Sequence, residues 1–414
     1  MMNTIDYSAK LTEEQLAALI TTYANKTTDF RFSGNTLKFT LTQSLFSSFK
    51  IDSGSKLLLK ALAKTIDLSS PIYFLDSGCG TGVIGLSIAS KNRETKGILE
   101  DRDCLAVCFS KFNAAQNNIS NITAKPSLLL EEQNSPFDLV VSNIPAKAGN
   151  PVITAFFRNV KNIVKPKGYV GIVIVSPLRE LADSCIALHS YPVVYKEDTD
   201  DYSVRIFQPV QSGTEIADSE LSQKAGIPAE YIRYTGGIDG APLQEALDTV
   251  YGIPGFDSMD TGEALAFSLA PTPKADDILM VKDPGQGVLL KLLCKDASVC
   301  KQILLQSRDL LQLRISINNL NTENANRSCI INHPDDFGVS VQCTYALFPV
   351  IQEVSGDTAH ISWKSFAENI SSGGKLLLYG KSAYMARFLK KKQGFSQRAQ
   401  KKSKGYKAVL LEKK

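Results

Sequence analysis

The sequence is poor in the residue patterns that bind metals. Its 414 residues include only three histidines, and among its eight cysteines no two form a Cys-x-x-Cys pair. Closely spaced thiolate and imidazole ligands are what a structural zinc site requires. We therefore expect no metal and no disulfide framework, and we interpret the cysteines as reduced and mostly buried thiols.

Long hydrophobic runs are also missing. The longest one, about Tyr169–Val175, is far shorter than the roughly 20 residues that cross a bilayer. The first ten residues are polar and lack the apolar core of a signal peptide. We expect a soluble, cytoplasmic protein without a membrane partner, and the length predicts two or three domains.

Acidic residues are absent from one part of the chain. The net charge is only +4, yet the segment from Lys381 to Lys407 contains ten Lys or Arg and no Asp or Glu. Such a run is typical of a phosphate-binding surface or, alternatively, of a solvated chain end. The candidate RNA-binding residues within it are Lys390, Lys391, Lys392, Arg398, Lys401 and Lys402.

Short apolar runs alternate with amphipathic stretches over the first half of the chain. The apolar runs predict strands at Ile72–Leu75, Ile98–Leu99, Leu139–Val141, Tyr169–Val175 and Val204–Phe207. The amphipathic stretches predict helices at Thr81–Ser90, Asp103–Asn117, Pro151–Val164 and Pro177–Ser190. This alternation indicates an α/β fold with a mostly parallel, Rossmann-like sheet that helices cover on both faces.

An internal repeat divides the chain into two similar halves. Matching motifs recur in the same order at offsets of 204 to 208, which indicates a tandem duplication. We expect domains at 1–210, with a helical lead-in, and at 211–414, joined by a polar linker at 211–222. The matches pair Asp76 with Asp283, Gly82 with Leu289, Glu100 with Gln306, and Asn143 with Leu347. The second half therefore looks degenerate and inactive.

A glycine-rich loop follows the first predicted strand. It runs Asp76-Ser77-Gly78-Cys79-Gly80-Thr81-Gly82, and glycines let a backbone turn tightly and approach a ligand closely. A dinucleotide-binding loop requires a further glycine at position 83, where this chain has Val83. By itself the loop is equally compatible with a tight strand–helix connection.

Two further motifs follow neighbouring strands. Glu100 comes after the next strand, where a carboxylate accepts ribose hydroxyls; a solvated turn is the alternative. Ser142-Asn143-Ile144-Pro145-Ala146 ends a third strand. The Asn143 amide suits a hydrogen bond from a target amino group, which is catalysis by positioning, and Pro145 stiffens the loop.

Together these motifs resemble the small-domain class I methyltransferases that use S-adenosylmethionine (AdoMet), especially the bacterial ribosomal RNA guanine-N2 methyltransferases. The resemblance covers about Phe46 to Phe207 and includes Phe46-Ser47 and Asp52-Ser53-Gly54-Ser55-Lys56. It implies two tandem class I methyltransferase domains and a ribosomal RNA or ribosomal-particle substrate. It implies catalytic roles for Asn143 and Pro145 and cofactor-binding roles for Asp76, Gly78, Cys79, Gly80, Gly82, Glu100, Asp101, Ser127 and Asn143.

The chain departs from the family at one motif. The family tetrapeptide is usually Asn-Pro-Pro followed by an aromatic residue, whereas here Ile144 and Ala146 stand at the second and fourth positions. The lost aromatic ring is a surface on which a planar base stacks. A methyltransferase acting on a protein glutamine or a small molecule, and a catalytically dead RNA-binding scaffold, therefore stay open as alternatives. The sequence does not predict an oligomeric state.

Overall fold

The protein is described from a computed structural model that covers residues 4–5, 11–45, 50–130, 136–210, 226–295, 300–334, 342–351, 367–390 and 394–414. The chain forms two compact units. We call Leu11–Leu221 the first copy, and Met1–Lys10 together with Ser222–Lys414 the second copy. The domain boundary predicted between residues 210 and 211, and the linker predicted at 211–222, both concern residues 211–225. These residues lie outside those described.

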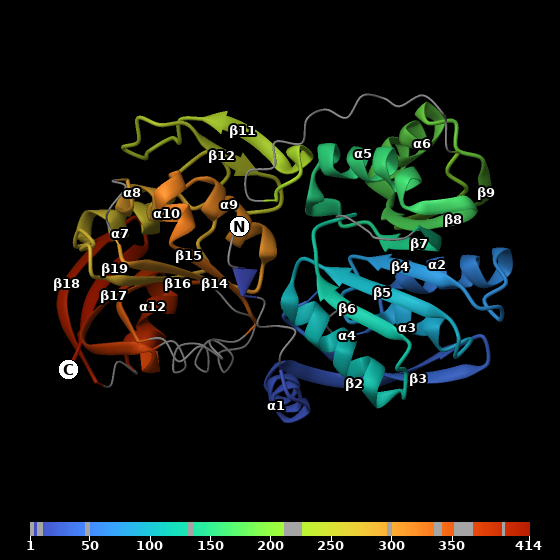
Figure 1. Ribbon diagram of the computed structural model, residues 1–414, viewed down its shortest axis with the longest axis horizontal. Helices are drawn as coiled ribbons and strands as arrows, with labels where there is room; N and C mark the ends of the chain where they lie inside the picture. The colour runs from blue at the N-terminus through green and yellow to red at the C-terminus, as the bar shows by residue number, and fades with distance from the viewer. Residues whose placement is uncertain are drawn as a thin grey trace. The chain divides into compact units, whose positions relative to one another are not determined.

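The first copy is built on a seven-stranded sheet with the strand order β6-β5-β4-β7-β8-β10-β9 (Figure 1). The strands pair in parallel from β6 to β8, and β10 is antiparallel to both of its neighbours. The strands are β4 (Tyr73–Ser77), β5 (Lys96–Asp101), β6 (Ile122–Pro126), β7 (Phe137–Asn143), β8 (Val164–Val175), β9 (Val193–Asp198) and β10 (Tyr202–Phe207). The chain leaves the central strand β4 in one direction and returns to its other side at β7, so ligands are expected at the carboxyl ends of β4 and β7.

Helices cover both faces of this sheet. Helices α2 and α3 and the hairpin β2–β3 share one hydrophobic core with the sheet, while α5 and α6 lie over the opposite face (Figure 1). The remaining elements are α1 (Glu13–Tyr23), β2 (Ala24–Phe32), β3 (Asn35–Thr42), α2 (Ser53–Thr65), α3 (Val83–Ala89), α4 (Cys104–Gln116), α5 (Asn150–Asn159) and α6 (Arg179–Leu188).

All nine predicted elements are present, with ends shifted by a few residues. The helix expected from Thr81 begins at Val83 because its N-cap, Gly82, has a left-handed φ of 83°. The helix expected to continue to Val164 ends at Asn159, and a 3-10 turn at Val160–Asn162 leads from it into β8. Strands β6 and β9 and the hairpin β2–β3 were not predicted. Strand β9 is largely exposed, and so lacks a buried apolar run.

The second copy repeats this architecture. Its sheet has the order β1-β15-β14-β13-β16-β17-β19-β18, which matches the first copy strand for strand apart from the added edge strand β1. The duplication predicted from the sequence is thus confirmed. Its elements are β1 (Thr4–Ile5), β11 (Ile232–Gly236), β12 (Leu247–Val250), α7 (Thr261–Leu269), β13 (Ile278–Lys282), α8 (Val288–Leu293), β14 (Gln302–Ser307), α9 (Leu310–Asn318), α10 (Thr322–Asn326), β15 (Ser328–Asn332), β16 (Cys343–Val350), β17 (Ile370–Lys381), α12 (Ser382–Leu389), β18 (Phe395–Ser403) and β19 (Tyr406–Lys413).

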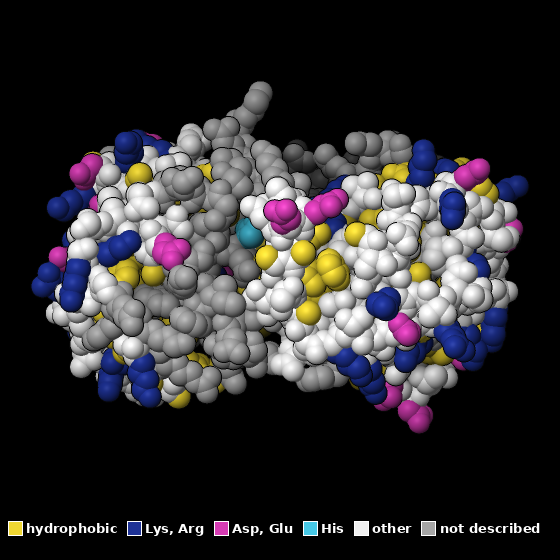
Figure 2. Space-filling model, turned by 90° about the horizontal axis from the view of Figure 1, so that it is seen from below, with side chains coloured by type: hydrophobic (Ala, Val, Ile, Leu, Met, Phe, Trp, Pro, Cys, Tyr) yellow, Lys and Arg dark blue, Asp and Glu magenta, His cyan; other side chains and the backbone are white. Residues whose placement is uncertain are grey.

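Two composition-based expectations can be compared with the structure. All eight cysteines lie within the described ranges, and each is buried and unbridged. In the part of the chain that the structure describes, no helix is long and apolar enough to span a membrane. Charged side chains of both signs are interspersed on the face shown in Figure 2, so any binding surface must be identified from local groups.

Candidate functional site

The glycine loop connects β4 to α3 and satisfies its own backbone. The amides of Gly78 and Cys79 both donate to the Glu100 carbonyl at 2.8 Å, and the Gly80 amide donates to the Asp101 carboxylate at 3.0 Å. A pyrophosphate would need such amides free and would be repelled by the Asp101 charge. The loop geometry therefore disfavours a dinucleotide and is compatible with a cofactor that has no phosphate.

Open space adjoins two of the loop glycines. Gly78 and Gly80 have φ values of 80° and 55°, and a Cβ atom added to either would meet nothing within 4 Å. A ligand can therefore approach the backbone here. Gly82 differs, because a Cβ there would lie 3.0 Å from the side chains of Leu86 and Ser110. The first two glycines leave room beside the loop, and Gly82 allows α3 to pack.

Asp76 lies beneath the loop and is fully buried. Its Oδ2 accepts the Gly85 amide at 2.7 Å in the first turn of α3, whereas its Oδ1 has no hydrogen-bond partner in the described structure. Burial, reinforced by the nearby Asp101 charge, raises the pKa of Asp76 to about 7 against the effect of the Gly85 hydrogen bond. This geometry supports a role in shaping the loop, and direct contact with a cofactor stays a prediction.

The other predicted cofactor residues gather at the ends of β5 and β6. The Glu100 carboxylate is 1% exposed and lies 3.1 Å from the Lys125 ammonium, which is itself 41% exposed. The Ser127 amide donates to the Asp101 carbonyl at 3.0 Å, which holds Ser127 beside the loop. The parallel pairing of β4, β5 and β6 thus brings Glu100, Asp101 and Ser127 to the same edge as the glycines.

Asn143 ends β7 at this edge and is held by the first turn of α2. Its Nδ2 donates to Asp52 Oδ2 at 3.0 Å and to Ser55 Oγ at 3.2 Å. Because the Asp52 carboxylate only accepts hydrogen bonds, it fixes which way the Asn143 amide faces. The Asn143 Oδ1 has no hydrogen bond within the described residues and remains available to a donor.

A tyrosine fixes Asp52 in turn. The Tyr202 hydroxyl donates to Asp52 Oδ1 at 2.8 Å, and Asp52 also caps α2 by accepting the Ser55 amide at 2.9 Å. The ring of Tyr202 packs so close to Gly54 that a Cβ at Gly54 would lie 2.8 Å from it. Burial, followed by the bond to Asp52, raises the pKa of Tyr202 to about 12, so the phenol keeps its proton at neutral pH.

The residues after Asn143 differ in their exposure. Ile144 is buried, and its amide donates to the Val173 carbonyl at 2.9 Å. Proline has no such donor, so the departure from the family pattern at Ile144 adds a strand hydrogen bond. Pro145 and Ala146 are exposed at the site edge. The lost aromatic residue would therefore have stood at the surface.

Sequence reasoning assigned no role to Asp52, Ser55, Tyr202 or Lys125. One signal for Asp52 was present, because it recurs as Asp260, which caps the equivalent helix α7 of the second copy. Tyr202 likewise corresponds to Tyr406, since the two residues occupy the same place in the pairing of the last strands. Both recurrences indicate how the first turn of α2 is held in place.

The second copy corrects the predicted register of the repeat. Ser77 pairs with Glu100 and Lys282 pairs with Gln306, so Lys282 occupies the place of Ser77. Gly82 therefore corresponds to Gly287, each being the left-handed N-cap of its helix, and the predicted match of Gly82 to Leu289 is wrong. The loop conformation is retained in the second copy.

The same register changes the matches of two predicted site residues. Asp76 corresponds to Val281 and not to Asp283. By the pairing of β7 and β16, Asn143 corresponds to Pro349 and not to Leu347. The match of Glu100 to Gln306 holds. The second copy thus keeps the loop and lacks both carboxylates and the amide.

A buried lysine further distinguishes the second copy. The Lys282 ammonium is 3.4 Å from Gln306 Oε1 and 4.0 Å from the Asp283 carboxylate. It also lies over the ring of Phe348, 5.7 Å from its centroid. A fixed positive charge at this place disfavours a cationic ligand.

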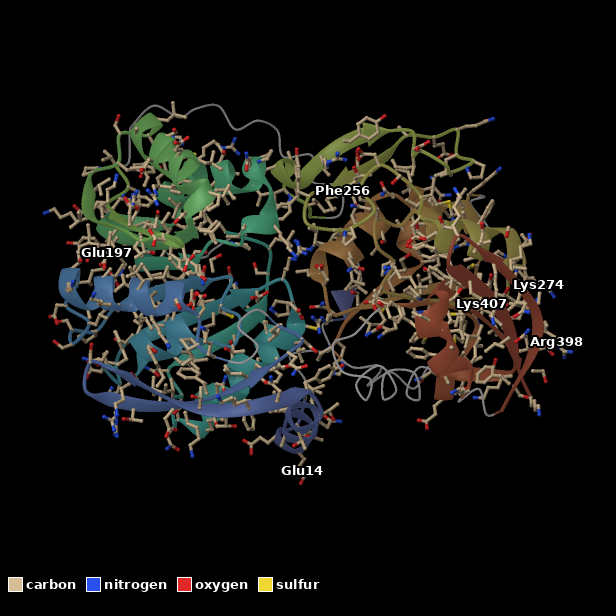
Figure 3. All side chains as sticks on the ribbon, turned by 180° about the vertical axis from the view of Figure 1, so that it is seen from behind. Glu14, Glu197, Phe256, Lys274, Arg398 and Lys407 are labelled. Atoms are coloured by element: carbon tan, nitrogen blue, oxygen red, sulfur yellow. The ribbon has the colours of Figure 1, made fainter. Side chains whose placement is uncertain are left out.

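Three of the six predicted RNA-binding residues lie on the β18–β19 hairpin. Arg398, Lys401 and Lys402 belong to β18, and Figure 3 shows Arg398 and Lys407 on this hairpin. Arg398 pairs with Glu412 at 2.9 Å, and Lys401 donates to the Ser268 carbonyl at 3.2 Å. Lys390 is exposed at the end of α12, and Lys391 and Lys392 lie outside the described residues.

The strand order, the loop and the anchored amide define a Rossmann-like methyltransferase. The family model described as methyltransferase small domain matches residues 36–185. The uncharacterized protein YbxB of Bacillus subtilis is 34% identical over 154 residues, which are 36% of this chain and 75% of YbxB. The ribosomal RNA small subunit methyltransferase C of Actinobacillus pleuropneumoniae is 32% identical over 29% of this chain and 35% of its own length.

One solved structure resembles the whole chain. The T. thermophilus 16S rRNA N2 G methyltransferase RsmC, in complex with AdoMet and guanosine, has a TM-score of 0.63 over 94% of this chain and 98% of its own. At 16% identity the likeness concerns the fold. The chain belongs to the methyltransferase small-domain family, whose cofactor is AdoMet, and it is an AdoMet-dependent methyltransferase.

Proposed function

We propose that the first copy transfers the methyl group of AdoMet to an exocyclic amino nitrogen of a nucleobase, namely N2 of guanine in ribosomal RNA. The observation that carries this proposal is the orientation of Asn143. Its Nδ2 is held by Asp52 and Ser55, which leaves Oδ1 to accept a hydrogen bond. An amino group attached to a planar base is the matching donor.

The residues of the first copy account for the positioning. Asn143 Oδ1 accepts one N–H of the target amino group and so directs its lone pair toward the space beside Gly78 and Gly80. When bound there, AdoMet supplies an electrophilic methyl group. Glu100 is the carboxylate suited to ribose hydroxyls, and Asp76, Gly78, Cys79, Gly80, Gly82, Asp101 and Ser127 form the surrounding cradle.

The choice of ribosomal RNA follows from the relatives. Several of the matched proteins are named ribosomal RNA small subunit methyltransferase C, and one matched structure holds guanosine. The alignment covers 35% of the length of the first of these, so its substrate is proposed for this chain. A protein glutamine, whose side-chain amide is also planar, is the alternative that exposed Ala146 keeps open. A ribosomal RNA substrate would place the enzyme in the cytoplasm. The substrate would be either free RNA or RNA within a ribosomal particle.

The second copy is proposed as an RNA-docking unit. Lys402 and Lys404 are exposed on its β18–β19 hairpin, beside Arg398 and Lys401. Lys390, Lys391 and Lys392 precede the hairpin in the sequence. The missing carboxylates and the buried Lys282 indicate that this copy binds no AdoMet of its own.

A direct test compares two acceptors. Purified enzyme is incubated with radiolabelled AdoMet and either total RNA or total protein, and the label in each fraction is counted. We expect label in RNA, with turnover lowered at least tenfold by Asn143→Ala and AdoMet affinity changed only a few-fold. Label confined to protein would refute the nucleobase assignment. A parallel loss of turnover and AdoMet affinity in Asn143→Ala would refute its positioning role.

A further inference from the structure

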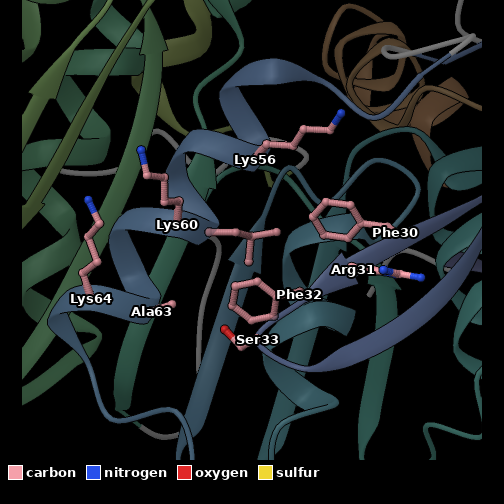
Figure 4. A pocket seen from close by; sticks show the side chains of 9 residues that line it. Phe30, Arg31, Phe32, Ser33, Lys56, Lys60, Ala63 and Lys64 are labelled. Atoms are coloured by element: carbon pink, nitrogen blue, oxygen red, sulfur yellow. The ribbon is translucent and has the colours of Figure 1, made fainter.

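The first copy contains an open pocket between α2 and the β2–β3 hairpin. Its volume is about 440 Å³, and its lining includes Lys56, Lys60, Lys64, Arg31 and the ring of Phe30 (Figure 4). No acidic residue lines this pocket within the described part of the chain. The pocket is thus a cationic surface with an apolar wall, and nothing in the methyl-transfer geometry uses it.

The three lysines form a stripe along one side of α2. They are spaced four residues apart, and at 1.5 Å per residue neighbouring lysines lie about 6 Å apart along the helix. Figure 4 shows the three side chains extending from the helix beside the pocket. Like charges at this spacing destabilise a helix. The stripe is therefore a cost to the free protein that a bound polyanion would offset.

Neighbouring groups only partly neutralise this stripe. Glu197 approaches Lys60 at 3.7 Å, and Lys60 is still 59% exposed. The Lys64 ammonium lies 5.8 Å from the centroid of the Tyr195 ring and also interacts electrostatically with Glu197. Lys56 is exposed. The single carboxylate of Glu197 thus faces two of the three lysines, and the stripe keeps a net positive charge.

The stripe begins at the reactive end of the first copy. Ser55, which contacts Asn143, immediately precedes Lys56 in the first turn of α2. A strand whose target base reaches Asn143 would therefore pass the lysines in order. The positive charge of the stripe suits a polyphosphate backbone, since neutralised phosphates supply most of the sequence-independent affinity of proteins for nucleic acids.

We propose that Lys56, Lys60, Lys64 and Arg31 bind successive phosphates of the single-stranded RNA that flanks the methylated nucleotide, with Phe30 as an apolar wall for a ribose or base. This inference rests on the proposed function, and it names the surface that orients the proposed RNA substrate. The occupant is an RNA backbone, and no base sequence is read there.

The test replaces the stripe and compares it with an equal change of charge elsewhere. The variant carries Lys56→Gln, Lys60→Gln and Lys64→Gln. The control carries Arg93→Gln, Lys96→Gln and Lys167→Gln, three exposed residues of the first copy that do not line the pocket. Binding of a short single-stranded RNA without guanine is measured by fluorescence anisotropy at several salt concentrations, without AdoMet. Calorimetry with AdoMet confirms that each variant is folded.

We expect the stripe variant to bind this RNA at least tenfold more weakly. Its log–log salt slope should be flatter by about 0.7 for each lost phosphate contact, while the control variant and AdoMet binding are unchanged. Equal losses in both variants, or an unaltered slope, would overturn the proposal. Weaker binding of a polyglutamate peptide with unchanged RNA binding would also overturn it, in favour of an acidic protein partner. Because the probe has no guanine, the result is independent of whether guanine is the methylated base.

Discussion

Replacing Asp52 with alanine tests how the reactive amide is held. Asp52→Ala removes the acceptor of four hydrogen bonds, from Asn143 at 3.0 Å, Tyr202 at 2.8 Å, and the amide and hydroxyl of Ser55 at 2.9 and 3.4 Å. Hydrogen bonds to a charged group are worth about 1.5–3 kcal/mol each. If the hydrogen bond from Asn143 to Asp52 serves to orient the Asn143 amide, its removal costs about 2 kcal/mol of transition-state stabilisation. That cost lowers kcat about 30-fold.

The same change also removes a helix cap, and this effect needs a control. Loss of an N-cap costs about 1 kcal/mol of stability. Asp260→Ala removes the equivalent cap of α7, where Asp260 accepts the Glu263 amide at 2.9 Å and Pro349 stands in the place of Asn143. We expect both variants to lose similar stability on chemical denaturation, and only Asp52→Ala to lose activity.

Steady-state kinetics and AdoMet titration together decide the outcome. Asp52→Ala should lower kcat and leave the Kd for AdoMet within a few-fold. Asp52→Asn should restore most of the rate, because its Oδ1 still accepts from Asn143 and its Nδ2 can donate to the Tyr202 oxygen. An unchanged kcat in Asp52→Ala, or an equal loss in Asp260→Ala, would refute the positioning role.

Three further outcomes follow. Calorimetry should give one AdoMet per chain. Glu100→Gln should abolish this binding, because it gives the first copy the glutamine that the second copy has at Gln306. A stoichiometry near two would contradict an empty second copy. Because burial raises the pKa of Asp76 to about 7, the folded state binds more protons than the unfolded state between about pH 4 and 7, so stability falls as pH rises through this window. The loss amounts to about 4 kcal/mol, and parallel stability–pH curves for wild type and Asp76→Asn would contradict it. Replacing Lys402 and Lys404 with glutamine should weaken RNA binding with a flatter salt slope, and unchanged binding would remove the second copy from RNA docking.

The fold could be predicted from the sequence because strands and glycine turns have local sequence signals. The strand–loop–helix from Tyr73 to Ala89 and the duplication were predicted in this way. The register of the repeat could not be predicted in this way. Asp283 is the same residue type as Asp76, but its backbone occupies the place of Gly78; φ is 42° at Asp283 and 80° at Gly78. Only strand pairing reveals that shift of two residues.

The contacts of the site also lay beyond the reach of the sequence. Asp52 and Asn143 are 91 residues apart, and Asp52 and Tyr202 are 150 apart. The local sequence predicts Asp52 only as a helix cap, and Asp52 does cap α2. Its second role depends on the side of the sheet on which α2 packs, and no periodicity records that.

We propose that Asn143 presents guanine N2 for methylation in ribosomal RNA. Mass spectrometry of nucleosides, after digestion of ribosomal RNA treated with enzyme and AdoMet, tests this role most directly. We predict N2-methylguanosine with the wild-type enzyme and a strong reduction with Asn143→Ala. A different methylated nucleoside, or equal N2-methylguanosine with Asn143→Ala, would contradict the account.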